Sequence, residues 1–157
     1  MFQNKFLILN SAFLILFALQ IEAAPFTDNT DGTVKDNATG LIWQKCSRGQ
    51  GATDCSGTAT TATWSDAITY CSGLSLVAGK TWRLPQVNEL KTIVDTTKAS
   101  GATIDTTAFP ATVASGYWSS TTYAPSTTAA WPVYFANGVV VNDLKTSPYY
   151  VRCVSGP

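Results

Sequence analysis

The sequence predicts a single α+β domain in which two helices pack on antiparallel strands. Two segments, residues 63–73 and 85–94, have the apolar spacing and the end signals of helices. Other segments alternate apolar and polar residues around turns rich in Asn and Gly, which is typical of β-hairpins. Four cysteines in 157 residues add the expectation of two disulfides. We expect residues 24–157 to form this one domain.

Residues 1–23 are typical of a secretory signal peptide. Lys5 provides a short positive region, Phe6–Leu19 is a mostly apolar run, and Ile21 and Ala23 suit cleavage after Ala23. The run is shorter than the ~20 apolar residues that span a membrane. The mature protein is therefore expected to be secreted, periplasmic or at the cell surface, with no transmembrane segment after signal cleavage.

The charges of the chain are balanced and scattered. Ten Lys and Arg residues match ten Asp and Glu residues, and no histidine is present. Nucleic-acid-binding domains instead concentrate Lys and Arg on one face, so we expect no nucleic-acid partner. The absence of a basic cluster also weakens the hypothesis that the ligand is a sulfated glycan.

The clearest helix signal follows Thr63. Thr63 can cap the helix, and Asp66 three residues later completes a capping-box-like pair. Gly73 near the end of the segment is expected to stop the helix in a left-handed conformation. The residues that form one apolar stripe are Trp64, Ala67, Ile68, Cys71 and Leu74.

A second helix is expected to begin at Pro85, which suits the first helical position. Glu89 then lies in the first turn, where a negative charge is favourable. We expect Arg83 to form a structural pair, for which Glu89 is the candidate partner. The predicted buried face consists of Val87, Leu90 and Val94.

Strand signals occur along the rest of the chain. Residues 31–45 are predicted to form a hairpin, and Tyr117–Trp118 a strand. Residues 131–141 give the strongest hairpin signal, because Asn137-Gly138 favours a type I′ turn. Residues 149–154 are expected to close the sheet.

Four of these segments together resemble the Lcl C-terminal domain family, found at the ends of collagen-like bacterial adhesins and in many small secreted proteins. With the first hairpin they extend from Asp31 to Val154. The resemblance implies a variant of the C-type-lectin-like fold. The segments that carry it are residues 63–71, 81–90, 117–120 and 150–154.

The four cysteines allow three disulfide pairings. Cys46 and Cys55 bracket a short polar loop that a disulfide would close. The resemblance implies that Cys71 and Cys153 join the first helix to the last strand, where C-type-lectin-like domains have a long-range bridge. A zinc site is disfavoured, because the spacings are not those of paired CxxC motifs and the chain lacks histidine.

The chain offers little for catalysis, and we expect no enzymatic activity, no cofactor and no metal. Ser-His-Asp and Cys-His arrangements are excluded by the lack of histidine. A less favoured alternative is chemistry like that of formylglycine-generating enzymes, distant structural relatives with a copper-binding cysteine pair. Here all four cysteines already fit a structural framework.

Calcium-dependent sugar binding is also disfavoured. The proline triplets of calcium-binding C-type lectins, Glu-Pro-Asn and Gln-Pro-Asp, are missing. Asn142 and Asp143 match two residues of the second lectin motif, Trp-Asn-Asp. Calcium requires roughly six to eight oxygen ligands, and only these two side chains are candidate ligands. We expect them to end a strand and begin a turn.

The resemblance implies an adhesin-like binding module that recognises a glycan or a host or matrix protein through its loops, and it implies that homo-oligomers can form. The alternative is a structural or assembly subunit of an envelope complex without a small-molecule ligand. Most tryptophans lie at core-facing positions, whereas Trp131 borders a Thr/Ser-rich loop and is the best exposed ring. The candidate ligand-binding residues are Trp118, Tyr123, Trp131, Asn142, Asp143 and Lys145.

Overall fold

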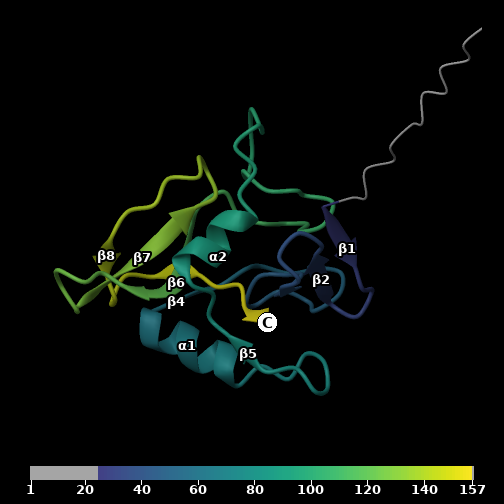
Figure 1. Ribbon diagram of the computed structural model, residues 1–157, viewed down its shortest axis with the longest axis horizontal. Coiled ribbons are helices and arrows are strands. Elements are labelled where there is room, and N and C mark those ends of the chain that lie inside the picture. Colours follow the sequence, from purple (N-terminus) through teal and green to yellow (C-terminus); the bar gives the residue numbers. More distant parts are fainter. Residues whose placement is uncertain (1–24, 157) are drawn as a thin grey trace, which may run out of the picture.

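The computed structural model describes residues 25–156, which form two five-stranded sheets and two helices (Figure 1). The α+β class and the number of helices are thus confirmed, and the predicted signal peptide lies outside the described residues. No helix within residues 25–156 is long and apolar enough to cross a membrane. In spatial order, the first sheet contains β1 (Phe26–Asp28), β2 (Thr33–Asp36), β3 (Ile42–Gln44), β10 (Val154–Ser155) and β5 (Trp82–Arg83).

The second sheet holds the candidate binding residues. Its β6–β9 pair is parallel, whereas its other pairs are antiparallel. The predicted strand at 149–154 is therefore divided, because β9 joins this sheet and β10 joins the other. In spatial order, the second sheet contains β4 (Thr61–Ala62), β9 (Tyr149–Tyr150), β6 (Gly116–Thr122), β7 (Ala129–Tyr134) and β8 (Asp143–Leu144).

Helix α1 (Trp64–Ser72) begins where the sequence predicts. Thr63 Oγ1 accepts a hydrogen bond from Asp66 N at 3.3 Å and donates one to Asp66 Oδ2 at 2.7 Å. Gly73 ends the helix, but its φ of −90° is right-handed, so the predicted left-handed stop is wrong. The Gly73 N–H instead bonds back to the carbonyl of Thr69.

Helix α2 (Val87–Thr92) begins two residues later than predicted. The carbonyl of Pro85 accepts a hydrogen bond from Ser120 N at 2.8 Å, which holds Pro85 in the connection before the helix. Gln86 becomes the N-cap, and its N–H donates to Glu89 Oε2 at 2.7 Å. Arg83 forms two hydrogen bonds to the Glu89 carboxylate, which confirms the expected pairing.

The two helices lie on opposite faces of the second sheet, α2 above and α1 below in Figure 1. Consecutive residues of β6 divide between two cores. Tyr117 packs in the core that contains Leu90 of α2, and Trp118 packs in the core that contains Ala67 of α1. This is the alternation expected of a strand with both faces covered.

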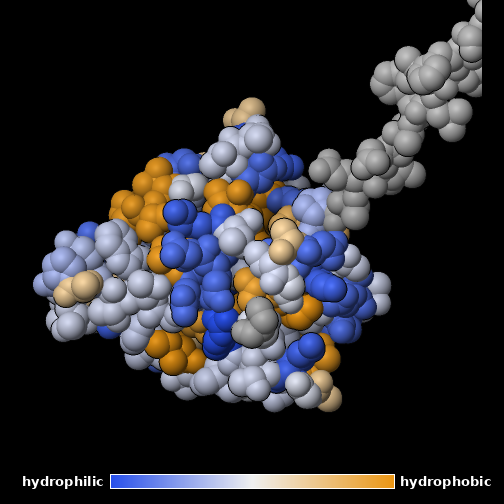
Figure 2. Space-filling view, viewed as in Figure 1, coloured by the Kyte–Doolittle hydropathy of each residue, from blue (hydrophilic) through white to orange (hydrophobic). Residues whose placement is uncertain are grey.

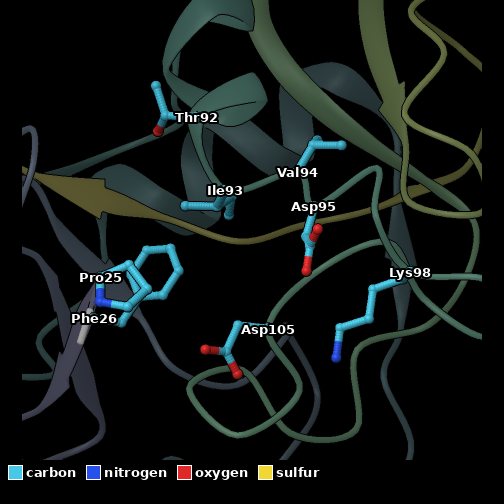
Figure 3. A pocket seen from close by; sticks show the side chains of 8 residues that line it. All are labelled: Pro25, Phe26, Thr92, Ile93, Val94, Asp95, Lys98 and Asp105. Atoms are coloured by element: carbon cyan, nitrogen blue, oxygen red, sulfur yellow. The ribbon is translucent and has the colours of Figure 1, made fainter. Parts of the chain in front are cut away.

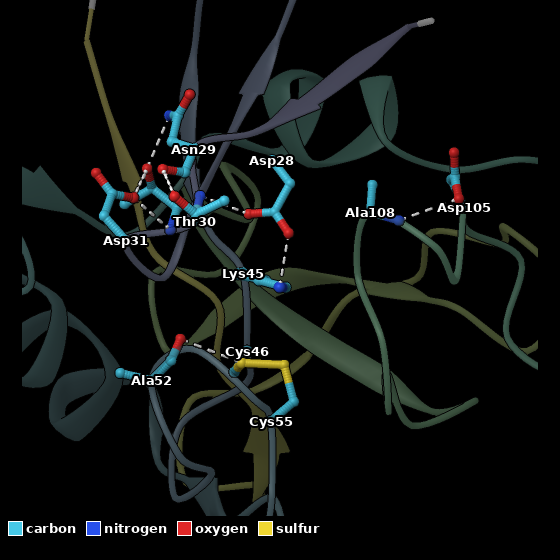
Figure 4. A network of polar contacts seen from close by, with 11 residues as sticks. Asp28, Asn29, Thr30, Asp31, Lys45, Cys46, Ala52, Cys55, Asp105 and Ala108 are labelled. Carbon is cyan, nitrogen blue, oxygen red and sulfur yellow. Dashed lines mark hydrogen bonds and ion pairs between the residues drawn. A yellow bond between two sulfur atoms is a disulfide. The ribbon is translucent and has the colours of Figure 1, made fainter.

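Both disulfides have the expected pairing, Cys46–Cys55 and Cys71–Cys153, and all four cysteines are buried. The second bridge joins α1 to the segment before β10 across 82 residues, which contributes about 4.5 kcal/mol in the chain-entropy model. The first bridge lies below an ion pair between Lys45 and Asp28, 2.7 Å long, that ties β1 to the end of β3 (Figure 4).

The predicted hairpin at 131–141 forms, but its turn and its second strand differ from the prediction. Of the two turn residues only Gly138 has a positive φ, +76°, whereas a type I′ turn requires two. The register runs through the pairs Val133–Val140 and Ala130–Asp143. Pro132 lacks the N–H that would donate to the carbonyl of Val141, so the ladder is interrupted before β8.

Candidate functional site

Trp118 belongs to the core. Its ring is fully buried, and its Nε1 donates a hydrogen bond to the carbonyl of Ala62 at 3.0 Å. Tyr149 lies against it edge to face, with ring centroids 4.8 Å apart. A ligand at the surface therefore has no access to this candidate ring.

Tyr123 and Trp131 form a partly exposed aromatic pair. Their ring centroids are 5.1 Å apart and their planes are nearly perpendicular, at 89°. In such an edge-to-face pair at least one face of each ring stays outside the contact. Trp131 alternates with Pro132 and shares its sheet face with Val133, which packs in the core on the α2 side. The aromatic pair therefore lies on the α2 side of the sheet.

Asn142 lies in the interruption of the ladder, at the position opposite Trp131. The pairs Ala130–Asp143 and Val133–Val140 fix a register in which residues 131 and 142 are opposite. Asn142 is exposed, and Leu144, which shares its face, is 55% exposed. We call the group of Tyr123, Trp131, Asn142 and Leu144 the Trp131 surface.

A closed hairpin loop holds the aromatic pair in place. Tyr123 N donates to the carbonyl of Ala129, and Ala129 N donates to the carbonyl of Ser126, each at 3.0 Å. The Ser126 and Thr128 hydroxyls also share a hydrogen bond of 3.0 Å. These bonds fix the backbone between Tyr123, which directly follows β6, and Ala129, the first residue of β7, two residues before Trp131.

Asp143 is turned to the opposite, α1 side of the sheet. Its Oδ2 accepts a hydrogen bond from the Tyr149 hydroxyl at 2.6 Å, and its Oδ1 accepts one from Leu144 N at 2.7 Å. The bond from Tyr149 holds the pKa of the Asp143 carboxyl below its usual value, whereas burial and this bond raise the pKa of Tyr149. The Tyr149 hydroxyl also shares a 2.5 Å hydrogen bond with that of Tyr134.

The orientation of the Asp143 side chain is relevant to the hypothesis of a calcium site. Asn142 directly precedes β8, which begins at Asp143, and the alternation along the extended chain places the two side chains on opposite faces. Within residues 25–156 no three or more His, Cys, Asp or Glu residues gather closely enough to hold a metal ion. Calcium-independent binding stays a prediction.

Lys145 also lies on the α1 side, where it serves as a structural clamp. Its ammonium is 3.8 Å from the centroid of the Trp64 ring and donates to Thr122 Oγ1 at 2.9 Å. The structure therefore brings together Tyr123, Trp131 and Asn142, but it separates them from Asp143 and Lys145.

One hollow of the structure was not predicted from the sequence. It has a volume of about 370 Å³. Figure 3 shows the carboxylates of Asp95 and Asp105 between Phe26 and Lys98. Both carboxylates cap their own turns, since Asp95 Oδ1 accepts from Thr97 N at 3.0 Å and Asp105 Oδ1 from Thr107 N at 2.8 Å. The Asp-Thr-Thr triplets at 95–97 and 105–107 are the signal in the sequence, and they indicate turns.

Comparison with known protein families gives a match over most of the described residues. No curated protein matches the chain. The family model of the Lcl C-terminal domain matches residues 32–155, which include both sheets apart from β1, both helices and all four cysteines. The chain therefore belongs to the Lcl C-terminal domain family.

Proposed function

We propose that the chain is an adhesin-like binding module that recognises a saccharide at the Trp131 surface. Its family is one of extracellular and surface domains, and two disulfides suit an oxidising compartment. A variant of the C-type-lectin-like fold, in which loops are held by a disulfide-linked scaffold, is part of the proposal. Binding residues often lie on loops and strand ends that such a scaffold positions.

The observation that carries the proposal is the aromatic pair of Tyr123 and Trp131. Both rings remain partly exposed, and they lie beside a loop rich in hydroxyl groups. The apolar face of a pyranose ring stacks on aromatic faces, and aromatic residues are favoured at binding sites. The closed loop fixes both rings before a ligand arrives, which reduces the entropy lost on binding.

We further propose that the role is not enzymatic. The chain has no histidine, and its four cysteines are all consumed by disulfides. The cysteine chemistry of formylglycine-generating enzymes requires thiols that this arrangement does not supply.

A second candidate, an assembly subunit that binds protein, is favoured by the edge of the second sheet. Val139, Val141 and Leu144 are 47%, 39% and 55% exposed, and they flank or form the edge strand β8. Figure 2 shows an apolar patch over the segment that leads into this strand. An exposed apolar edge is a typical site for pairing with another polypeptide, including a second copy of the chain.

A glycan array distinguishes the two candidates. The purified mature protein is applied with calcium and with EGTA, in parallel with Trp131→Ala and, as a matched control on the other face, Val139→Ala. The saccharide proposal predicts that Trp131→Ala loses binding and Val139→Ala retains it. An array without any bound glycan, together with self-association that Val139→Ala weakens, would favour the assembly role.

A further inference from the structure

We propose that the saccharide bound at the Trp131 surface is uncharged, with neither sulfate nor carboxylate groups. The inference rests on the proposed function and adds the class of ligand. Residues 106–142 contain no Asp, Glu, Lys or Arg, whereas the chain as a whole is 13% charged.

The fold gathers this uncharged run around the Trp131 surface. Strands β6 and β7 and the loop between them come entirely from it, as do Tyr123, Trp131 and Asn142. In Figure 2 the lobe at the left, formed by the end of this hairpin, is mostly pale, whereas the strong blue of the most hydrophilic residues lies nearer the middle of the molecule. The residues of this run offer a ligand hydroxyl, amide and aromatic groups.

The nearest charges along the chain are turned away and already paired. The Asp143 carboxylate accepts hydrogen bonds from Tyr149 and Leu144 N on the α1 side. The Lys145 ammonium lies over the Trp64 ring and donates to Thr122, also on the α1 side. Neither group is presented to a ligand that stacks on Trp131.

An anionic saccharide would bind weakly to such a surface. Sulfate and carboxylate groups are recognised through charge-assisted hydrogen bonds, above all from Arg. Without such hydrogen bonds, the free-energy cost of desolvating an anionic group is not offset. Neutral hydroxyl and acetamido groups, in contrast, match the exposed Asn142 amide, which offers both donors and acceptors.

The test is an array with neutral, sialylated and sulfated glycans, followed by a salt titration of the best ligand. We expect neutral members to bind, and their affinity to change by less than about twofold between about 50 and 500 mM NaCl, because screening acts only on charges. Preferred binding of sulfated or sialylated members, with a steep loss in salt, would overturn the inference and leave the proposed function standing. Binding to no glycan would overturn both.

A gain-of-charge variant makes the test sharper. Thr127 is exposed in the hairpin loop, so Thr127→Lys is expected to fold normally, with Thr127→Gln as its matched control. We expect the Lys variant to bind heparin oligosaccharides where the parent does not, and to keep its affinity for the neutral ligand within about twofold. Heparin binding by the parent at the level of the Lys variant would contradict an uncharged site.

Discussion

The ammonium of Lys145 lies 3.8 Å from the centroid of the Trp64 ring, and the Lys145 carbonyl accepts a hydrogen bond from Trp64 N at 2.9 Å. These contacts fasten the segment after β8 to the start of α1. The Trp64 indole adds a third link, because its Nε1 donates to the carbonyl of Ser119 at 2.9 Å. One tryptophan thus joins α1, β6 and the segment after β8.

Trp64→Ala should therefore be strongly destabilising. We expect a loss of about 3 kcal/mol in the free energy of unfolding, the lower end for a large aromatic residue, because the side chain is only partly buried. Asp66→Ala, which removes only a capping contact, should cost about 1 kcal/mol. Urea denaturation followed by circular dichroism measures both. A larger effect of Asp66→Ala than of Trp64→Ala would contradict this account of α1.

The Tyr149 ring leaves no room for a side chain at Gly116. A Cβ at residue 116 would lie 2.4 Å from Tyr149 Cδ1, far inside van der Waals contact. Because that ring also packs on Trp118, it has little room to move. We expect Gly116→Ala to cost about 2 kcal/mol, within the range for overpacking. In the double variant with Tyr149→Ala the added methyl group should cost much less, so additive effects in denaturant unfolding would exclude this clash as the cause.

The Asp143 carboxylate should contribute to the dependence of stability on pH. The hydrogen bond from Tyr149 lowers its pKa in the folded state. A lowered pKa stabilises the folded protein above the unfolded pKa of about 3.9, and this contribution is lost as the pH falls through the folded value. We expect wild type to melt above Asp143→Asn at pH 6 to 7, and the difference in melting temperature to shrink below about pH 4. A difference that is constant over this range would show that Asp143 acts through its shape alone.

Arg152 is fully buried without a carboxylate partner among the described residues. Its Nη2 donates to Ser47 Oγ at 3.3 Å and to Thr112 Oγ1 at 2.8 Å, and the guanidinium is 4.7 Å from the Phe109 ring centroid. Burial lowers the pKa of this group. Because an unpaired buried charge stabilises poorly, Arg152→Met should cost no more than about 1 kcal/mol.

Arg152→Ala is the control, since it leaves a cavity where Arg152→Met fills most of the volume. We expect it to cost about 3 kcal/mol, as large-to-small core changes do. Thermal unfolding of the two variants compares them directly. Equal losses would show that the hydrogen bonds to Ser47 and Thr112 outweigh packing.

Features set by neighbouring residues were predictable from the sequence. The cap of α1 depends on Thr63 and Asp66 alone, and it forms as expected. The start of α2 could not be predicted from the sequence, because the hydrogen bond that keeps Pro85 out of the helix comes from Ser120, 35 residues away. The interrupted strand before β8 likewise depends on a proline in its partner strand, β7.

The candidate site was predictable in content but not in arrangement. Trp131 was proposed because it borders a Thr/Ser-rich loop, and Asn142 because it matches a residue of a lectin motif. Whether Asn142 or Asp143 faces the aromatic pair depends on the register of the β7–β8 pair, and a shift of one residue would exchange them. Trp118 could not be separated from Trp131 without knowing that helices cover both faces of β6.

Trp131→Ala provides the decisive test of the site. The ring contacts Tyr123 at the surface and is only partly buried, so its loss should lower the melting temperature by only a few degrees. Saccharide binding should weaken at least about tenfold, which corresponds to about 1.4 kcal/mol. Isothermal titration calorimetry and differential scanning fluorimetry on the same preparation separate the two effects.

EGTA should leave wild-type binding unchanged, because Asp143 is held by Tyr149 on the other face. Binding that EGTA abolishes and calcium restores would instead identify Asn142 and Asp143 as calcium ligands, and a Trp131→Ala variant that unfolds would place this ring in the core.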